Sequence, residues 1–229
     1  MASKKTLNAK NLEELGAARL AQLLIEISTG NALAKRRLRL ELAGAQCPGE
    51  VACEVDKRLS QIRRSRSFVD WQNRKALIAD LQTQRKAIVE QVAQSDPAEG
   101  LALMWRFLGL ASSIFGRCDD SSGMVIAIFH EAVADLAEIA VRANPRPEVL
   151  GYAVYDALTA NEYGQYDDLI GTLAPVLGER GLTYLRGRMT ALAKTPLKRP
   201  AGKDRVAVGW ASSGAIYQDE IDERSRDST

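Results

Sequence analysis

The sequence predicts an all-α protein, an array of about nine antiparallel helices arranged as a helical bundle or a short α-solenoid, with an irregular C-terminal tail. Aromatic residues make up only 6% of the 229 residues, and there are only seven prolines, a balance that favours helix over sheet. Apolar residues recur at helical spacing in almost every segment, and no segment of useful length alternates with the period of a strand.

Local signals place the helices of the N-terminal half. A first long helix, with apolar residues at positions 20, 23, 24 and 27, is expected to end at Gly30. A second runs from Asn31 to Ala43 and stops at Gly44. A third begins near Pro48, where the missing backbone N–H costs nothing. The fourth begins at about Asp70, which we interpret as its N-cap.

The next helix is expected to form the centre of the core. Residues 95–99 combine a polar cap, a proline and an acid in the first turn, which is typical of a helix start. The helix that follows, as far as Phe115, is apolar on nearly all sides and must therefore be covered by several neighbours. A polar turn over residues 119–123 precedes a helix over Met124–Ala143, which the Asn-Pro-Arg-Pro segment 144–147 breaks.

Helical spacing continues to about residue 192, and Pro175 is expected to kink or end one of these helices. The turn over residues 163–170 loosely resembles that of a tetratricopeptide hairpin, but no period of about 34 residues recurs. From Thr195 onward, proline and basic residues indicate a linker, and Val206–Tyr217 has no stable period. We therefore expect a helical domain over residues 1–194 and a linker with an irregular or truncated tail over residues 195–229.

Composition excludes most catalytic and metal-binding sites. The single histidine, His130, has no second histidine to complete a zinc motif or a catalytic triad. The three cysteines form no C-x-x-C pair, and their odd number suits a reducing compartment. The first ten residues lack the apolar stretch of a secretory signal, and the longest apolar stretch, residues 101–115, is too short to cross a bilayer. We expect a cytoplasmic protein without cofactor, metal or membrane association.

Three carboxylates, those of Glu131, Asp135 and Glu138, are predicted to lie on one helix face. Such carboxylates can act as acid and base when a pocket separates their pKa values. We interpret them instead as a solvated face with Arg142 as an ion-pair partner, and we expect no enzymatic activity. An enzyme would need a deep pocket lined by groups such as Glu131, Asp135, Tyr152 or Tyr155.

Basic residues are concentrated in the N-terminal part of the chain. Residues 1–90 carry 17 basic and 10 acidic side chains, a net charge of +7, whereas the remainder has a net charge of −5. Two clusters are candidates for anion binding: Lys35, Arg36 and Arg39 in one helical sector, and Arg63, Arg64 and Arg66 at the end of another helix. The order of charges along the second helix, acids first and arginines last, is also what the helix dipole favours without any ligand.

The basic clusters can serve nucleic-acid binding only if they form one exposed surface. The sequence shows no aromatic platform beside the arginines. If the arginines scatter, or if Glu41, Asp56 and Asp70 neutralise them, nucleic-acid binding loses its basis.

Several strings of residues are distinctive. They occur at residues 4–17 (KKTLNAKNLEELGA), 34–43 (AKRRLRLELA), 64–72 (RSRSFVDWQ), 103–107 (LMWRF), 118–123 (CDDSSG) and 163–167 (YGQYD). Together they resemble bacterial proteins of the domain of unknown function 6880 family, along the whole chain. The resemblance implies no activity and no catalytic residues. It implies longer relatives with further helical hairpins, so we expect this chain to be an N-terminal part or a truncated product.

The function that we predict from the sequence is that of a helical scaffold, which binds an unidentified partner protein through a groove or face of the array. The alternative is binding of nucleic acid or another polyanion by the N-terminal arginine and lysine clusters.

Overall fold

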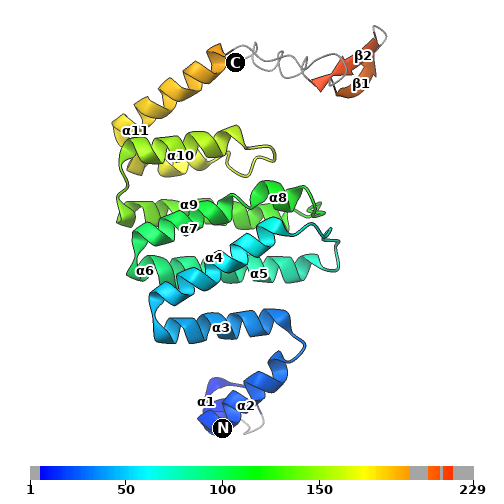
Figure 1. The fold of residues 1–229 in the computed structure, drawn as a ribbon, viewed down its shortest axis with the longest axis vertical. Coiled ribbons are helices and arrows are strands. Elements are labelled where there is room, and N and C mark those ends of the chain that lie inside the picture. Colours follow the sequence, from blue (N-terminus) through cyan, green and yellow to red (C-terminus); the bar gives the residue numbers. More distant parts are fainter. Residues whose placement is uncertain (1–5, 196–205, 212–213, 219–229) are drawn as a thin grey trace.

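The computed structural model describes residues 6–195, 206–211 and 214–218, and the all-α array expected from the sequence is confirmed. The helices are stacked in chain order along the long axis of the molecule, with neighbouring layers running in alternating directions (Figure 1). In chain order they are α1 (Ala9–Glu13), α2 (Ala17–Ser28), α3 (Ala32–Gln46), α4 (Pro48–Arg64), α5 (Arg74–Ala87), the π-helix η1 (Ile88–Val92), α6 (Ala93–Ser95), α7 (Pro97–Leu108), α8 (Ala111–Phe115), α9 (Met124–Ala143), α10 (Pro147–Thr159) and α11 (Leu169–Lys194).

The core is centred on α7 and α9, as the apolar helix over residues 97–115 predicted. α7 packs against α4, η1, α6 and α9, so that neighbouring elements cover it on several sides. Phe107 of α7 and Phe129 of α9 are fully buried with ring centroids 5.7 Å apart. The helix is shorter than expected, because it ends at Leu108 and the separate α8 continues the chain.

Three predicted boundaries were wrong. α3 continues through Gly44 to Gln46, because Gly44 keeps a helical conformation, and a Cβ there would lie 2.7 Å from Oε1 of Gln91, whose side chain would have to move. Asp70 is not the N-cap of α5. Its carboxylate accepts backbone hydrogen bonds in the turn that precedes Arg74, the first residue of α5.

The third correction concerns α11, which kinks at Gly178 and not at Pro175. Gly178 has φ 56° and ψ −172°, a conformation that is accessible in practice only to glycine. The proline is accommodated inside the helix one turn before the kink. The glycine therefore sets the direction of the second half of α11.

The apolar stripe predicted for the first long helix is only partly covered. Leu20 and Leu23 of α2 are half-buried, whereas Leu24 and Ile27 are exposed. Among the described residues, α2 packs mainly against the short α1 and against α3.

A β-hairpin lies where the sequence predicted no regular structure. β1 (Ala207–Ala211) pairs with β2 (Gly214–Tyr217) in antiparallel register, with Trp210 opposite Ala215. The prediction that this chain is an N-terminal part or a truncated product concerns the side chains of residues 209–217 and the residues 219–229, which lie outside the described residues. No helix in the described ranges has the length and apolar character that crossing a membrane requires.

We predict that Gly100→Ala destabilises the protein. Gly100 lies in the first turn of α7, where an added Cβ would be 2.5 Å from the Cβ of Ala93. Overpacking of this kind costs about 1–3 kcal/mol, measurable by urea unfolding followed by far-ultraviolet circular dichroism. Gly187→Ala is the matched control, since a Cβ at Gly187 of α11 meets nothing within 4 Å. Gly187→Ala should raise the free energy of unfolding by roughly 0.5–1 kcal/mol, because alanine favours the helix interior over glycine. Equal effects of the two changes would contradict this account.

Tyr166 anchors the turn between α10 and α11. Its hydroxyl is buried and donates a 2.6 Å hydrogen bond to the carbonyl of Leu108. Burial raises the pKa of Tyr166 from 10.0 to about 12. Between these values the unfolded chain releases the proton that the folded protein keeps, so the contribution of Tyr166 to stability is complete below pH 10 and is lost as the pH rises toward 12.

We therefore predict that Tyr166→Phe lowers the free energy of unfolding by about 1 kcal/mol at pH 8, through the lost hydrogen bond. The variant should also show a smaller loss of stability between pH 9 and pH 11 than the parent protein. Urea unfolding at the three pH values measures both effects. Parallel pH profiles for the two proteins would show that the hydroxyl is not buried as described.

Candidate binding surface

A buried carboxylate fixes the helices that carry both basic clusters. Asp80 of α5 is only 2% exposed. Its Oδ2 accepts hydrogen bonds from Nε (2.8 Å) and Nη2 of Arg58 on α4, and lies 3.4 Å from Nη2 of Arg36 on α3. Its Oδ1 accepts a 3.3 Å bond from the buried Gln84. This Asp80 cluster (Arg36, Arg58, Asp80 and Gln84) holds α3, α4 and α5 in register, and the sequence analysis did not find it.

The first basic cluster lies on one side of α3, next to α4. Arg36 and Arg39 line a groove of about 240 Å³ together with Lys57 and Arg58 of α4. Lys35 is exposed on the same helical sector. Two acids face the four basic side chains of this groove. Asp80 contacts both Arg36 and Arg58, and Glu54 pairs with Lys57 at 2.8 Å, so half of the positive charge is balanced. Arg39 belongs to no ion pair between the described residues.

None of the ion pairs between described residues includes an arginine of the second cluster, whereas one member of the first cluster, Arg36, is paired. Arg63 and Arg64 form the last turn of α4, and Arg66 follows in the loop to α5; all three are exposed. The acids expected to neutralise the clusters do not do so. Asp56 pairs with Arg106, and Asp70 holds its own turn. Glu41 lines a cavity next to Arg37.

Two large aromatic side chains accompany these arginines, which the sequence analysis did not anticipate. Phe68 and Trp71 of the α4–α5 loop are 68% and 67% exposed. Arg63, Arg64, Arg66, Phe68 and Trp71 are all exposed within residues 63–71, the end of α4 and the loop that follows, and we call this set the α4–α5 corner. The string RSRSFVDWQ contains these two aromatic residues beside arginines. Hydrophobic periodicity, however, cannot show which apolar residues of a loop point to solvent.

The backbone of the corner is held firmly, although its rings are not packed. The N–H of Val69 donates a 2.8 Å bond to the carbonyl of Arg117, and the N–H of Asp119 donates to the carbonyl of Val69 at 3.3 Å. The guanidinium of Arg117 also binds the carbonyls of Ser67 and Ile62. Val69 packs against the core, so its neighbour Phe68 points outward in this extended segment.

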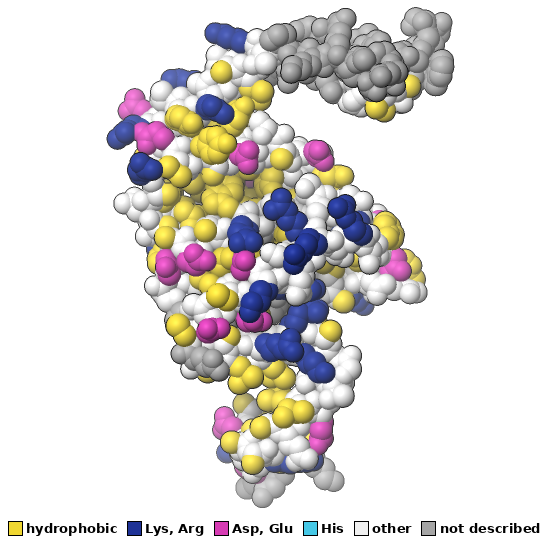
Figure 2. Space-filling view, in the orientation of Figure 1, with side chains coloured by type: hydrophobic (Ala, Val, Ile, Leu, Met, Phe, Trp, Pro, Cys, Tyr) yellow, Lys and Arg dark blue, Asp and Glu magenta, His cyan; other side chains and the backbone are white. Residues whose placement is uncertain are grey.

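The six candidate residues form two groups, one on α3 and one at the end of α4, with Arg66 in the loop that follows. Figure 2 shows Lys and Arg side chains gathered over α3, α4 and the neighbouring layer on one face of the molecule. In the α3 group Arg36 is bound to Asp80, whereas Lys35 and Arg39 belong to no ion pair between the described residues. The arginines of the α4–α5 corner are available to a partner.

Two of the three carboxylates of α9 form a structural brace with α5. Glu131 and Asp135 both contact Arg85 of α5, the latter with its Oδ2 3.3 Å from Nε. Arg142 does not pair with Glu138 as expected, because its guanidinium donates to the carbonyl of Ala93. Burial raises the pKa of Asp135, against the opposing effect of Arg85.

Other residues considered for catalysis are dispersed. Tyr152 and Tyr155 lie beneath the guanidinium of Arg188, away from the Arg85 brace on other elements. Nε2 of His130 is 3.4 Å from the carbonyl oxygen of Gly164. Within the described ranges, no three His, Cys, Asp or Glu side chains are grouped so that they could hold a metal ion.

The family of the chain follows from comparison with known families. The model of a family of unknown function, DUF6880, matches residues 2–229. The chain belongs to this family. The resemblance inferred from the distinctive strings is thereby confirmed, and the DUF6880 match extends over both the α4–α5 corner and the Asp80 cluster. Neither the curated proteins nor the solved structures contain a match to the chain.

We predict that Asp80→Asn strongly destabilises this DUF6880 protein, because the change leaves two partly buried guanidinium groups without a counter-charge. Removing one partner of a buried ion pair costs about 3 kcal/mol. Urea unfolding at two salt concentrations measures the loss, which should be similar at both because the cluster is shielded from solvent. Glu54→Gln, which removes the exposed pair with Lys57, is the control and should change stability little. An equally small effect of Asp80→Asn would refute the role of the cluster.

Proposed function

We propose that this DUF6880 protein is a helical scaffold that binds an acidic segment of a partner protein at the α4–α5 corner. The observation that carries the proposal is the exposure of Phe68 and Trp71 in the same short segment, residues 63–71, as three exposed arginines that pair with no described acid. Trp and Arg are among the residues that most often dominate protein–protein binding energies. No catalytic role is part of the proposal.

The aromatic rings supply the affinity. Phe and Trp bury about 150–250 Å² each when covered, and each 100 Å² of apolar surface contributes roughly 2.5 kcal/mol. The described structure gives neither ring a partner inside the protein. Because Val69, Asp70 and Arg117 already fix the backbone of the loop, little conformational entropy is lost when a partner covers the rings.

The arginines supply the selectivity for acidic partners. Arg63 and Arg64 lie at the C-terminal end of α4, where the helix dipole favours positive charge. This interaction keeps them in place without neutralising them, so they remain available for carboxylates. Guanidinium groups at a surface accelerate and select the encounter with a negatively charged partner, and salt weakens that effect.

Single-stranded nucleic acid is the second candidate for the same corner. The specific observation in its favour is the pairing of exposed rings with unneutralised arginines, since bases stack on aromatic side chains while arginines bind the phosphates. The α3 cluster with Lys35 and Arg39 lies on the adjoining helix and would extend the path of a strand. We place it second because Arg36 and Arg58 are already bound to Asp80.

The test compares two fluorescein-labelled probes of equal length, a peptide of alternating glutamate and leucine and an oligothymidylate. We expect fluorescence anisotropy to show that the peptide binds more tightly. The anisotropy is measured at a low and at a high salt concentration. The double change Phe68→Ala with Trp71→Ala should weaken peptide binding at least tenfold at both. Arg63→Ala with Arg64→Ala and Arg66→Ala should weaken it mainly at low salt.

The matched control removes three basic charges from α11, by changing Arg180, Arg186 and Lys194 to Ala, and should leave binding unchanged. Tighter binding of the oligothymidylate, lost in the corner variants and steeply dependent on salt, would replace the first candidate by the second. Binding that the control reduces as much as the corner variants would overturn both.

A further inference from the structure

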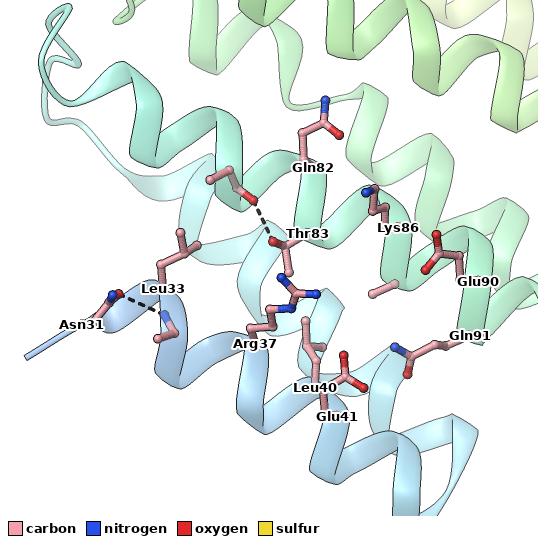
Figure 3. Close-up of a pocket in the computed structure, with 13 residues that line it drawn as sticks. Asn31, Leu33, Arg37, Leu40, Glu41, Gln82, Thr83, Lys86, Glu90 and Gln91 are labelled. Carbon is pink, nitrogen blue, oxygen red and sulfur yellow. Dashed lines mark hydrogen bonds between the residues drawn. The ribbon is translucent and has the colours of Figure 1, made fainter. Parts of the chain in front are cut away.

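A second candidate site lies on the other side of α3. A cavity of about 460 Å³ opens between α3 and the continuous helix formed by α5 and η1, and we call it the α3–α5 cavity. Figure 3 shows side chains from both helices directed into it. The residues that line it are Asn31, Leu33, Ala34, Arg37, Leu40, Glu41, Ala79, Gln82, Thr83, Lys86, Ala87, Glu90 and Gln91. It shares none of the residues of the α4–α5 corner, so the inference below is independent of the proposed function.

Four charged side chains line the cavity without pairing. Arg37 and Glu41 come from α3, and Lys86 and Glu90 come from the facing helix. None of the four belongs to an ion pair or side-chain hydrogen bond of the described structure, although both signs of charge face the same cavity. Figure 3 shows Arg37 near Thr83, with Lys86 and then Glu90 further along the facing helix. Glu41 and Gln91 also line a smaller neighbouring cavity beside Gly44, so both glutamates lie toward the η1 end. The cavity thus offers a cationic region and an anionic region.

The floor of the cavity is apolar. Leu40 and Ala87 are buried beneath it, and Leu33, Ala34 and Ala79 are half-buried at the end nearer the start of α3. An apolar floor with a few charged groups at fixed positions is the usual composition of a small-molecule site. The volume of about 460 Å³ lies within the range of small-molecule sites.

The π-helical segment supplies two residues of the anionic end. η1 spans Ile88–Val92. Its Glu90 and Gln91 line the cavity and continue the face that carries Thr83, Lys86 and Ala87. Gln91 extends toward Gly44 of α3, where any Cβ would approach its Oε1 to 2.7 Å. π-helical turns of this kind are frequent at functional sites.

We propose that the α3–α5 cavity binds a zwitterionic amino acid or dipeptide with an apolar side chain. Arg37 and Lys86 bind the carboxylate, Glu41 and Glu90 bind the ammonium group, and the floor of Leu33, Leu40 and Ala87 covers the apolar side chain. A simple anion would be repelled by the two glutamates, and a simple cation by Arg37 and Lys86. Only a ligand that carries both charges satisfies both ends.

The test uses L-leucyl-L-leucine as the probe and nuclear magnetic resonance titration of the full chain as the measurement. We expect saturable shifts with a dissociation constant of about 1 mM or below. N-acetyl-leucyl-leucine lacks the ammonium charge, and leucyl-leucine amide lacks the carboxylate. Each blocked peptide should bind at least tenfold more weakly than the zwitterion.

Two pairs of substitutions assign the ends. Arg37→Gln with Lys86→Gln should weaken binding of the zwitterion at least tenfold and should not weaken binding of the cationic amide, which gains from the loss of the two positive charges. Glu41→Gln with Glu90→Gln should weaken binding of the zwitterion to the same extent and should not weaken binding of the anionic acetylated peptide, which gains from the loss of the two negative charges. Lys75→Gln with Glu138→Gln changes one exposed charge of each sign outside the cavity and serves as the control.

The proposal is overturned if the zwitterion produces no saturable shift up to about 10 mM, or if the blocked peptides bind as tightly as the zwitterion. It is also overturned if the control lowers affinity as much as the cavity variants. Far-ultraviolet circular dichroism verifies that each variant is folded, and because all six changes replace exposed charges with amides, unfolding is not expected to obscure the result.

Discussion

The N-terminal layers of the array depend on one buried acid. Asp80 binds Arg58 of α4 and Arg36 of α3 from its position on α5, so a single carboxylate connects three consecutive helices. Burying a charge is tolerable only when partners compensate for the water that it loses. The two guanidinium groups and the amide of Gln84 provide that compensation. They also fix how α3 is placed relative to its neighbours, and with it the two surfaces on either side of that helix.

The position of α3 separates two chemically different environments. On the α4 side, positive side chains surround Asp80, and the surface continues toward the α4–α5 corner. On the α5 side, Arg37 and Glu41 face a cavity with charges of both signs. Neighbouring residues of one helix, Arg36 and Arg37, therefore take part in different interactions. Their order in the sequence alone gives no indication of this division.

Periodicity was sufficient to predict the architecture but not the contacts. The apolar spacing predicted most helices and the central position of the helix around Phe107, because burial of a stripe is a local property. Asp80 was missed because its partners are 22 and 44 positions away along the chain, beyond any local pattern. Gly44 was taken as a helix end because glycine often follows the last turn of a helix, and the side chain of Gln91, which lies against it, comes from a distant part of the sequence. Phe68 and Trp71 were missed because an aromatic residue in a loop can equally be buried.

The π-helical turn sets the angular phase of the rod in which it lies. α5, η1 and α6 form one continuous rod from Arg74 to Ser95, and the rod contains one residue more than an uninterrupted α-helix of the same number of turns would hold. Loss of that residue would change the angular phase of everything that follows by roughly 100°. The layers before and after Ile88 would then turn different faces toward each other. The extra residue therefore acts as a rotational offset between the N-terminal layers and the central core around α7 and α9.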